Sequence, residues 1–140
     1  MRFSIQKKTL LNLLTEQNKV VPIRTTLPIL SCALFTIEKN KLLIKTTNLN
    51  QTIISKTTIS NEKNGSTTIP MNKLLEIVTA LPNEEIKITS NEDFLIEINN
   101  NQGTYKITGR NPEEFPETSP IEKKNELSLP GKELTNIINK

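Results

Sequence analysis

The sequence predicts an α+β fold of duplicated βαβββ units, with two adjacent helices packed on curved antiparallel sheets. The first observation is a pattern at Thr67–Leu81, which reads as a short β run, a proline and an amphipathic helix. The segments near Ser4 and Ser128 repeat this pattern, at offsets of 64 and 60 residues from Thr68. A regular period of this kind indicates a tandem duplication. The second observation is that three β runs follow each of the first two helices.

The duplication also predicts the domain organisation. Two units, at residues 1–64 and 65–122, would form one domain over residues 1–122. Residues 123–140 would be the start of a second domain, truncated inside its helix. A strand and part of a helix cannot bury their apolar faces alone, so we expect the chain to be a fragment of a longer protein.

The first unit is predicted to open with a strand at Phe3–Ile5 and a helix at Lys7–Lys19. The helix is indicated by apolar residues at positions i, i+3 and i+4, namely Leu10, Leu13 and Leu14. Two prolines then predict a loop at Val20–Pro28. The nearly continuous apolar run Ile29–Ile37 is typical of a buried strand.

Two further strands are predicted in the first unit, at Leu42–Thr46 and Thr52–Ile59, before a polar loop at Ser60–Gly65. In the second unit, a helix at Met71–Leu81 follows Pro70, which suits a helix start because it lacks an N–H group. Its apolar stripe consists of Leu74, Ile77, Val78 and Leu81. The three following strands are predicted at Glu85–Thr89, Phe94–Ile98 and Thr104–Thr108, before a proline-rich connector at Gly109–Lys124.

Composition argues against an enzyme. The 140 residues include no histidine and a single aspartate, Asp93, which excludes His-based triads and His-based metal sites. We therefore expect neither a catalytic residue, nor a bound metal, nor a cofactor. The formal charge of +3 permits contact with nucleic acid without requiring it. The lone Cys32 is expected to be a buried structural thiol. A single cysteine, together with the absence of a signal peptide or membrane span, predicts a cytoplasmic location.

Several motifs together resemble one family, the bacterial DNA polymerase III beta subunit or sliding clamp. They are the opening MRFSIQKKTLLNLL, the run Arg24–Leu30, Thr47-Asn48-Leu49, Thr68-Ile69-Pro70 and Glu114-Phe115-Pro116. The resemblance covers essentially the whole chain, with 127–140 similar to the opening of the clamp's second domain. It implies a non-catalytic homodimeric ring that encircles duplex DNA, without regard to sequence, and confers processivity on the replicative polymerase. The clamp loader and polymerase would bind through later domains.

The resemblance also implies DNA-binding residues. Arg24 matches the position at which the family contacts DNA from the loop after the first helix. Lys73 and Asn72 match a basic pair at the start of the second helix, although Asn72 departs from that pattern. Lys8, on the first helix, is the fourth candidate. The alternative for each is a solvated surface residue with no ligand, which is the usual state of a lysine on a helix.

Tyr105 and Ile107 fall where the family places apolar side chains at the dimer interface. They lie on the last strand of the second unit, which is expected to be a sheet edge with both side chains exposed. The alternative is that both are core residues. At the level of the whole chain, the competing hypothesis is a non-catalytic protein-interaction module that uses its sheet edges and has no role with DNA.

Overall fold

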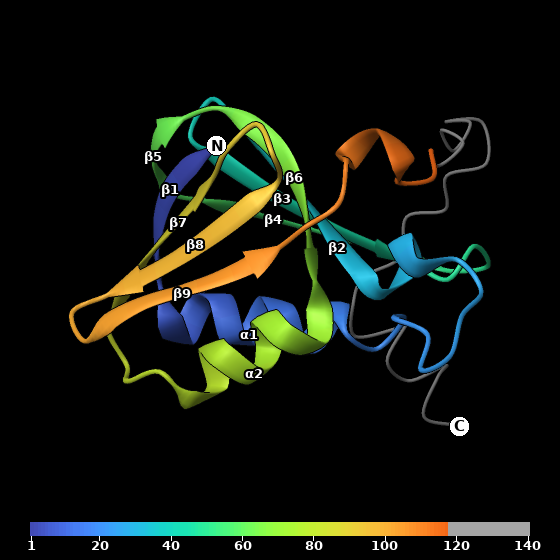
Figure 1. Ribbon diagram of the computed structural model, residues 1–140, viewed down its shortest axis with the longest axis horizontal. Helices are drawn as coiled ribbons and strands as arrows, with labels where there is room; N and C mark the ends of the chain where they lie inside the picture. Colours follow the sequence, from blue (N-terminus) through green and yellow to red (C-terminus); the bar gives the residue numbers. More distant parts are fainter. Residues whose placement is uncertain (118–140) are drawn as a thin grey trace, which may run out of the picture.

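Two antiparallel sheets stand over a layer of two helices (Figure 1). The computed structural model describes residues 1–117, and each unit opens with a strand followed by a helix, as the repeat predicts, although the first unit has one strand more than the predicted βαβββ pattern. The first unit holds β1 (Arg2–Gln6), α1 (Lys7–Gln17), β2 (Cys32–Glu38), β3 (Lys41–Thr47), β4 (Thr52–Thr58) and the short β5 (Ser60–Lys63). The second unit holds β6 (Gly65–Pro70), α2 (Met71–Ala80), β7 (Glu85–Ser90), β8 (Leu95–Asn100) and β9 (Gly103–Thr108). Two short 3₁₀ helices complete the set, η1 (Pro28–Ser31) and η2 (Pro112–Glu114).

The two units exchange their first strands. One sheet has the order β5-β1-β7-β8-β9 and the other the order β4-β3-β2-β6, with every neighbouring pair antiparallel. Strand β1 therefore pairs with β7 of the second unit, and β6 pairs with β2 of the first. Neither unit can complete its sheet without the other, so the two repeats form one domain.

A single core fills the space between the sheets and the helices. It includes Phe3 of β1 and Phe35 of β2, whose ring centroids lie 6.4 Å apart and so join the two sheets. Leu10 and Leu14 of α1 and Leu74 and Val78 of α2 belong to the same cluster and are fully buried. Of the other predicted stripe residues, Leu81 is also buried in the cluster, and Leu13 and Ile77 pack at its margin. The predicted helical stripes and the adjacent position of the helices are thus confirmed.

Two predicted boundaries are wrong. Ser60–Lys63 is a strand rather than a loop, because it pairs with β1 at the edge of the five-stranded sheet, where polar residues are tolerated. Residues 29–31 belong to η1 rather than to a strand. Pro28 starts this 3₁₀ turn, and the Leu30 amide donates to the Leu27 carbonyl over 3.0 Å.

Residues 29 and 30 are apolar because they form a second, smaller cluster. Ile29 and Leu30 pack against Phe115, which follows η2. The two segments are far apart in the sequence, and both belong to motifs that carry the family resemblance.

Two predicted features lie partly or wholly outside the described residues. The connector 109–124 is described as far as residue 117 and contains η2. The predicted third unit at 123–140 lies outside the described residues. Among the described helices, none is both long enough and apolar enough to cross a membrane.

Candidate nucleic-acid interface

The two helices lie side by side and run in opposite directions beneath the sheets (Figure 1). Their inward faces are apolar and buried, which leaves the outward faces polar. Neither helix has an acidic residue in its first turn. Instead, the first turn of α1 carries Lys7 and Lys8, and that of α2 carries Lys73.

This placement of cations has an electrostatic consequence. The N-terminus of a helix carries a partial positive charge, so lysines there gain nothing from the helix dipole. The exposed Lys8 and Lys73 add their own charge to it. Both helix starts therefore favour an anion, although the first N–H group of α1, that of Lys7, already donates to the Glu84 carbonyl over 2.9 Å.

The loop that follows α1 presents Arg24 to solvent. Its start is anchored by Val20, which is buried, and its end by Thr25, whose Oγ1 accepts a hydrogen bond from the Leu27 amide over 3.0 Å. Between these anchors, Ile23 has 100% of its surface exposed and Arg24 is also exposed. Pro22 restricts the backbone before them.

The antiparallel arrangement brings this loop to the start of α2. A hollow of about 350 Å³ lies between them, lined by Asn18, Lys19, Val21, Pro22, Ile23 and Asn72. Of the four predicted DNA-binding residues, Asn72 lines the hollow, while Lys73 and Arg24 are the sequence neighbours of its lining residues Asn72 and Ile23. Lys8 lies at the opposite end of α1, about 15 Å from Asn18 along the helix axis.

A buried glutamine that the sequence reasoning missed holds the end of α1 in place. Gln17 is fully buried, and its Nε2 donates to the Ile44 carbonyl over 3.0 Å and to Ser55 Oγ over 2.8 Å. Its Oε1 accepts from Thr46 Oγ1 over 2.6 Å. The position of Gln17 at i+7 from Leu10, on the apolar stripe, is the signal that could have identified it as buried.

The second candidate surface is the edge strand β9, which pairs with β8 alone. Tyr105 is 42% exposed on this strand. Ile107, however, is only 4% exposed and belongs to the main core. The expectation that both side chains are exposed is therefore wrong for Ile107, because its side chain packs into the main core, whereas Tyr105 stays exposed although it also lies opposite a buried residue, Ile98.

The chemistry of these surfaces is that of ion pairing. Among residues 1–117, no group of three or more His, Cys, Asp or Glu side chains could hold a metal ion. Cys32 is buried, as expected, and burial raises the pKa of its thiol above the ordinary value, which disfavours a reactive thiolate. The cations described above are left as the groups able to bind a ligand.

The family model for the DNA polymerase III beta subunit, N-terminal domain, matches residues 1–119. The chain belongs to this family. A beta sliding clamp from Halalkalibacterium halodurans is 33% identical over 63 residues, which is 45% of this chain and 17% of that protein. The family is one of sliding clamps that act in DNA replication and are non-catalytic.

Solved structures of beta clamps share the fold of this clamp domain. The DNA polymerase III subunit beta of Pseudomonas aeruginosa superposes with a TM-score of 0.91 at 26% identity, over 99% of this chain and 38% of that one. The Helicobacter pylori beta clamp, solved bound to a DNA ligase peptide, gives a TM-score of 0.82 at 26% identity, over 87% and 34%. A Bartonella birtlesii clamp bound to griselimycin gives 0.83 at 28% identity, over 87% and 33%. The chain thus spans well under half the length of these relatives.

Proposed function

We propose that this clamp domain is part of a homodimeric ring that encircles duplex DNA and confers processivity on the replicative DNA polymerase in the cytoplasm. In this proposal, residues 1–122 form the first domain and residues 123–140 begin the second. The observation that carries the proposal is the pair of antiparallel helices whose starts carry lysines, with the Arg24 loop beside the start of α2.

The proposed DNA contacts are made by Arg24, Lys73, Asn72 and Lys8. Three of them are exposed cations and Asn72 is an exposed amide donor, so all four suit phosphate oxygens. Phosphate contacts position a protein on DNA without reading the base sequence. A ring that slides needs contacts of this kind, and its processivity then comes from enclosure of the duplex rather than from tight binding.

The other proposed partners bind elsewhere. The edge strand β9, with the exposed Tyr105, is proposed to meet a later domain of the second subunit. The clamp loader and the polymerase are proposed to bind through later domains. The Helicobacter pylori clamp bound to a DNA ligase peptide shows that a clamp of this family can bind a partner peptide. No cofactor is required for any of these contacts.

The DNA contact can be tested by fluorescence anisotropy with the 140-residue chain and two unrelated labelled duplexes. We expect weak binding that is equal for the two duplexes and falls steeply with salt, because few phosphates are contacted and an open fragment cannot enclose the DNA. The double variant Arg24→Ala/Lys73→Ala should weaken binding to both duplexes and lower the salt slope by about 2, because each cation that pairs with a phosphate accounts for about 1.

A matched control removes the same charge elsewhere. The variant Lys63→Ala/Lys106→Ala loses two exposed lysines of the five-stranded sheet and should bind DNA like the parent chain. Equal losses in both variants would mean that only net charge matters. Sub-micromolar affinity at physiological salt, or a preference for one duplex, would also contradict the proposal, and absence of binding would favour the interaction-module hypothesis.

A further inference from the structure

The outward face of the four-stranded sheet carries a cluster of lysines that the DNA proposal does not use. Alternation along the strands points Phe35, Leu42 and Ile44 into the core shared with the helices. The residues that alternate with these inward-facing side chains point to the opposite side of the sheet, and the surface that they form is remote from the helices. It is called the outer face below, and its central residues are Thr36, Glu38, Lys39, Lys41, Leu43 and Lys56.

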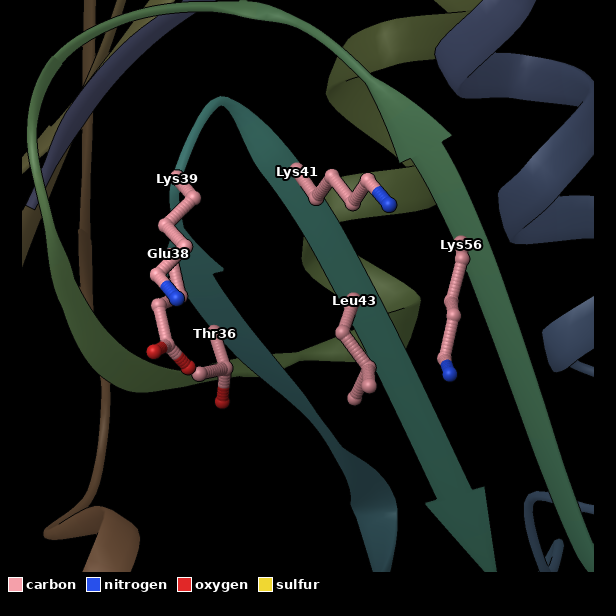
Figure 2. Close-up of a pocket in the computed structure, with 6 residues that line it drawn as sticks. All are labelled: Thr36, Glu38, Lys39, Lys41, Leu43 and Lys56. Atoms are coloured by element: carbon pink, nitrogen blue, oxygen red, sulfur yellow. The ribbon is translucent and has the colours of Figure 1, made fainter.

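These residues line a hollow of about 350 Å³ (Figure 2). The strand register places Leu43 of β3 between Thr36 of β2 and Lys56 of β4. Directly paired residues on one face of a sheet have Cβ atoms about 5 Å apart, so the leucine side chain forms the floor of the hollow between them. Figure 2 shows Lys41 on the same strand as Leu43, Lys56 beside it on the neighbouring strand, and Lys39 next to Glu38.

The charge of the outer face is unbalanced. Three lysines surround the hollow and Glu38 is the single acid in its lining, which gives a local net charge of +2. Within residues 1–117, Lys39, Lys41 and Lys56 form no ion pair, whereas Lys19 and Lys106 each pair with a glutamate, at 2.9 Å and 3.7 Å. The three ammonium groups are therefore available to an anionic partner.

Apolar surface continues beside the hollow along β4. Ile54 is 51% exposed and lies opposite Lys45 in the register, on the same face as Lys56. Lys45 itself is engaged, since its Nζ lies 5.8 Å from the centroid of the Phe115 ring. The outer face thus combines unpaired cations with two aliphatic side chains, Leu43 and Ile54.

We propose that the outer face is a docking surface for an acidic peptide segment of a partner protein, with an aliphatic residue among its carboxylates. The carboxylates would pair with Lys39, Lys41 and Lys56, and the aliphatic side chain would cover Leu43 and Ile54. A single-stranded nucleic acid fits less well, because bases stack on exposed aromatic rings and no exposed aromatic lies on this face among the described residues.

This proposal is independent of the DNA contact and places its partner on the other side of the fold. A ring that holds DNA against α1 and α2 leaves the outer face of this sheet free for a second partner. Loss of peptide binding and loss of DNA binding can therefore be measured separately on the same chain.

The test is a fluorescence anisotropy titration of the 140-residue chain with a labelled glutamate-rich peptide that carries a central leucine. Lys41→Ala/Lys56→Ala should raise the Kd for this peptide about tenfold, as expected for the loss of two exposed ion pairs. Lys63→Ala/Lys106→Ala, which removes the same charge from the other sheet, should leave the Kd unchanged. Replacing the leucine of the peptide with glutamine should also weaken binding, and circular dichroism should show that both variants remain folded.

Four results would overturn the proposal. Three of them are the absence of peptide binding at low salt, equal weakening of peptide binding by the two double variants, and equal affinity of the chain for the leucine and glutamine peptides. The fourth is that the parent chain binds a single-stranded oligothymidylate more tightly than the peptide, and that Lys41→Ala/Lys56→Ala weakens both interactions equally. The last result would assign the outer face to nucleic acid instead.

Discussion

At the scale of single residues, the buried Gln17 amide links the end of α1 to the four-stranded sheet. This amide group contacts β3 and β4 through hydrogen bonds to Ile44, Thr46 and Ser55. Because Arg24 lies on the loop that leaves α1, the position of that loop depends on this anchor. The same residue therefore contributes both to stability and to the geometry of the candidate DNA surface.

Replacing Gln17 with alanine should lower the free energy of unfolding by about 2–4 kcal/mol. The change leaves a cavity and removes one of the two acceptors of the buried Thr46 hydroxyl, which also donates to the Gln17 carbonyl over 2.9 Å. Urea denaturation would measure the effect, with Asn12→Ala as the control because Asn12 is exposed on the same helix. Equal stability of the two variants would show that the Gln17 hydrogen bonds contribute nothing.

Cys32 predicts a dependence of stability on pH. Burial raises the pKa of its thiol, so the folded chain keeps this proton at pH values where the unfolded chain has lost it. The unfolded state then binds fewer protons, and this group makes the free energy of unfolding fall as pH rises through the ordinary thiol pKa, between about pH 8 and about pH 10. Cys32→Ala should have a smaller slope in urea denaturation over this range. An unchanged slope would contradict the prediction.

At the scale of the elements, β6 and the segment after β9 approach each other closely. Thr68 Oγ1 donates to the Arg110 carbonyl over 2.7 Å and accepts from the Arg110 amide over 3.0 Å. Gly109, the preceding residue, lies so close that a Cβ atom there would collide with the Thr68 carbonyl oxygen and would lie 2.6 Å from Ile96 Cδ1. The glycine is needed for space, since its φ is not positive.

Gly109→Ala should therefore destabilise the fold by about 1–3 kcal/mol or more, because backbone must move to admit the methyl group. Gly103→Ala is the matched control, since a Cβ atom there would meet nothing within 4 Å. Its effect should stay within about 0.5 kcal/mol. Thermal unfolding of both variants gives the comparison, and similar Tm values would contradict the close approach.

The sequence predicts an element well where the spacing of its apolar residues is periodic. It predicts an element less well where only pairing with a distant strand determines the structure. The stripes of α1 and α2 are confirmed because the same residues that define the period are the ones buried. The strand β5 was missed because its polar residues read as a loop, and only its partner β1 makes it a strand. The exchange of β1 and β6 cannot be predicted from the sequence of either unit, because the residue pattern of each strand is compatible with any antiparallel partner.

The candidate sites, too, depend on tertiary structure that the sequence pattern does not predict. Arg24, Asn72 and Lys73 are predicted from the family resemblance, and the antiparallel helices explain why the loop that carries Arg24 lies beside the start of α2. Ile107 was misjudged because it shares a strand face with Tyr105 and alternation alone cannot tell where along a face the core ends. Of the outer-face lysines, Lys41 lies on β3 and Lys56 on β4, whereas Lys39 lies in the turn between β2 and β3. Their grouping depends on the register of these strands, which the sequence pattern does not give.

At the scale of the whole molecule, Tyr105 and Ile107 should now behave differently. Tyr105→Ser should leave the 140-residue chain stable, because the side chain is 42% exposed, whereas Ile107→Lys should unfold it by placing a charge in the core. In a chain that includes the proposed later domains, Tyr105→Ser should shift the proposed dimeric ring towards monomers. Circular dichroism and light scattering would measure the two effects. A Tyr105→Ser chain that stays fully dimeric would exclude Tyr105 from the interface.

The central claim is that the face formed by α1, α2 and the Arg24 loop binds duplex DNA. The most direct measurement is a titration of the ¹⁵N-labelled 140-residue chain with a short duplex, followed by NMR amide chemical shifts, because weak binding is still detected residue by residue. We expect the shifts to concentrate at Lys8, Arg24, Asn72 and Lys73 and to disappear as salt is raised. Shifts concentrated on the sheets, or no shifts at low salt, would contradict the claim.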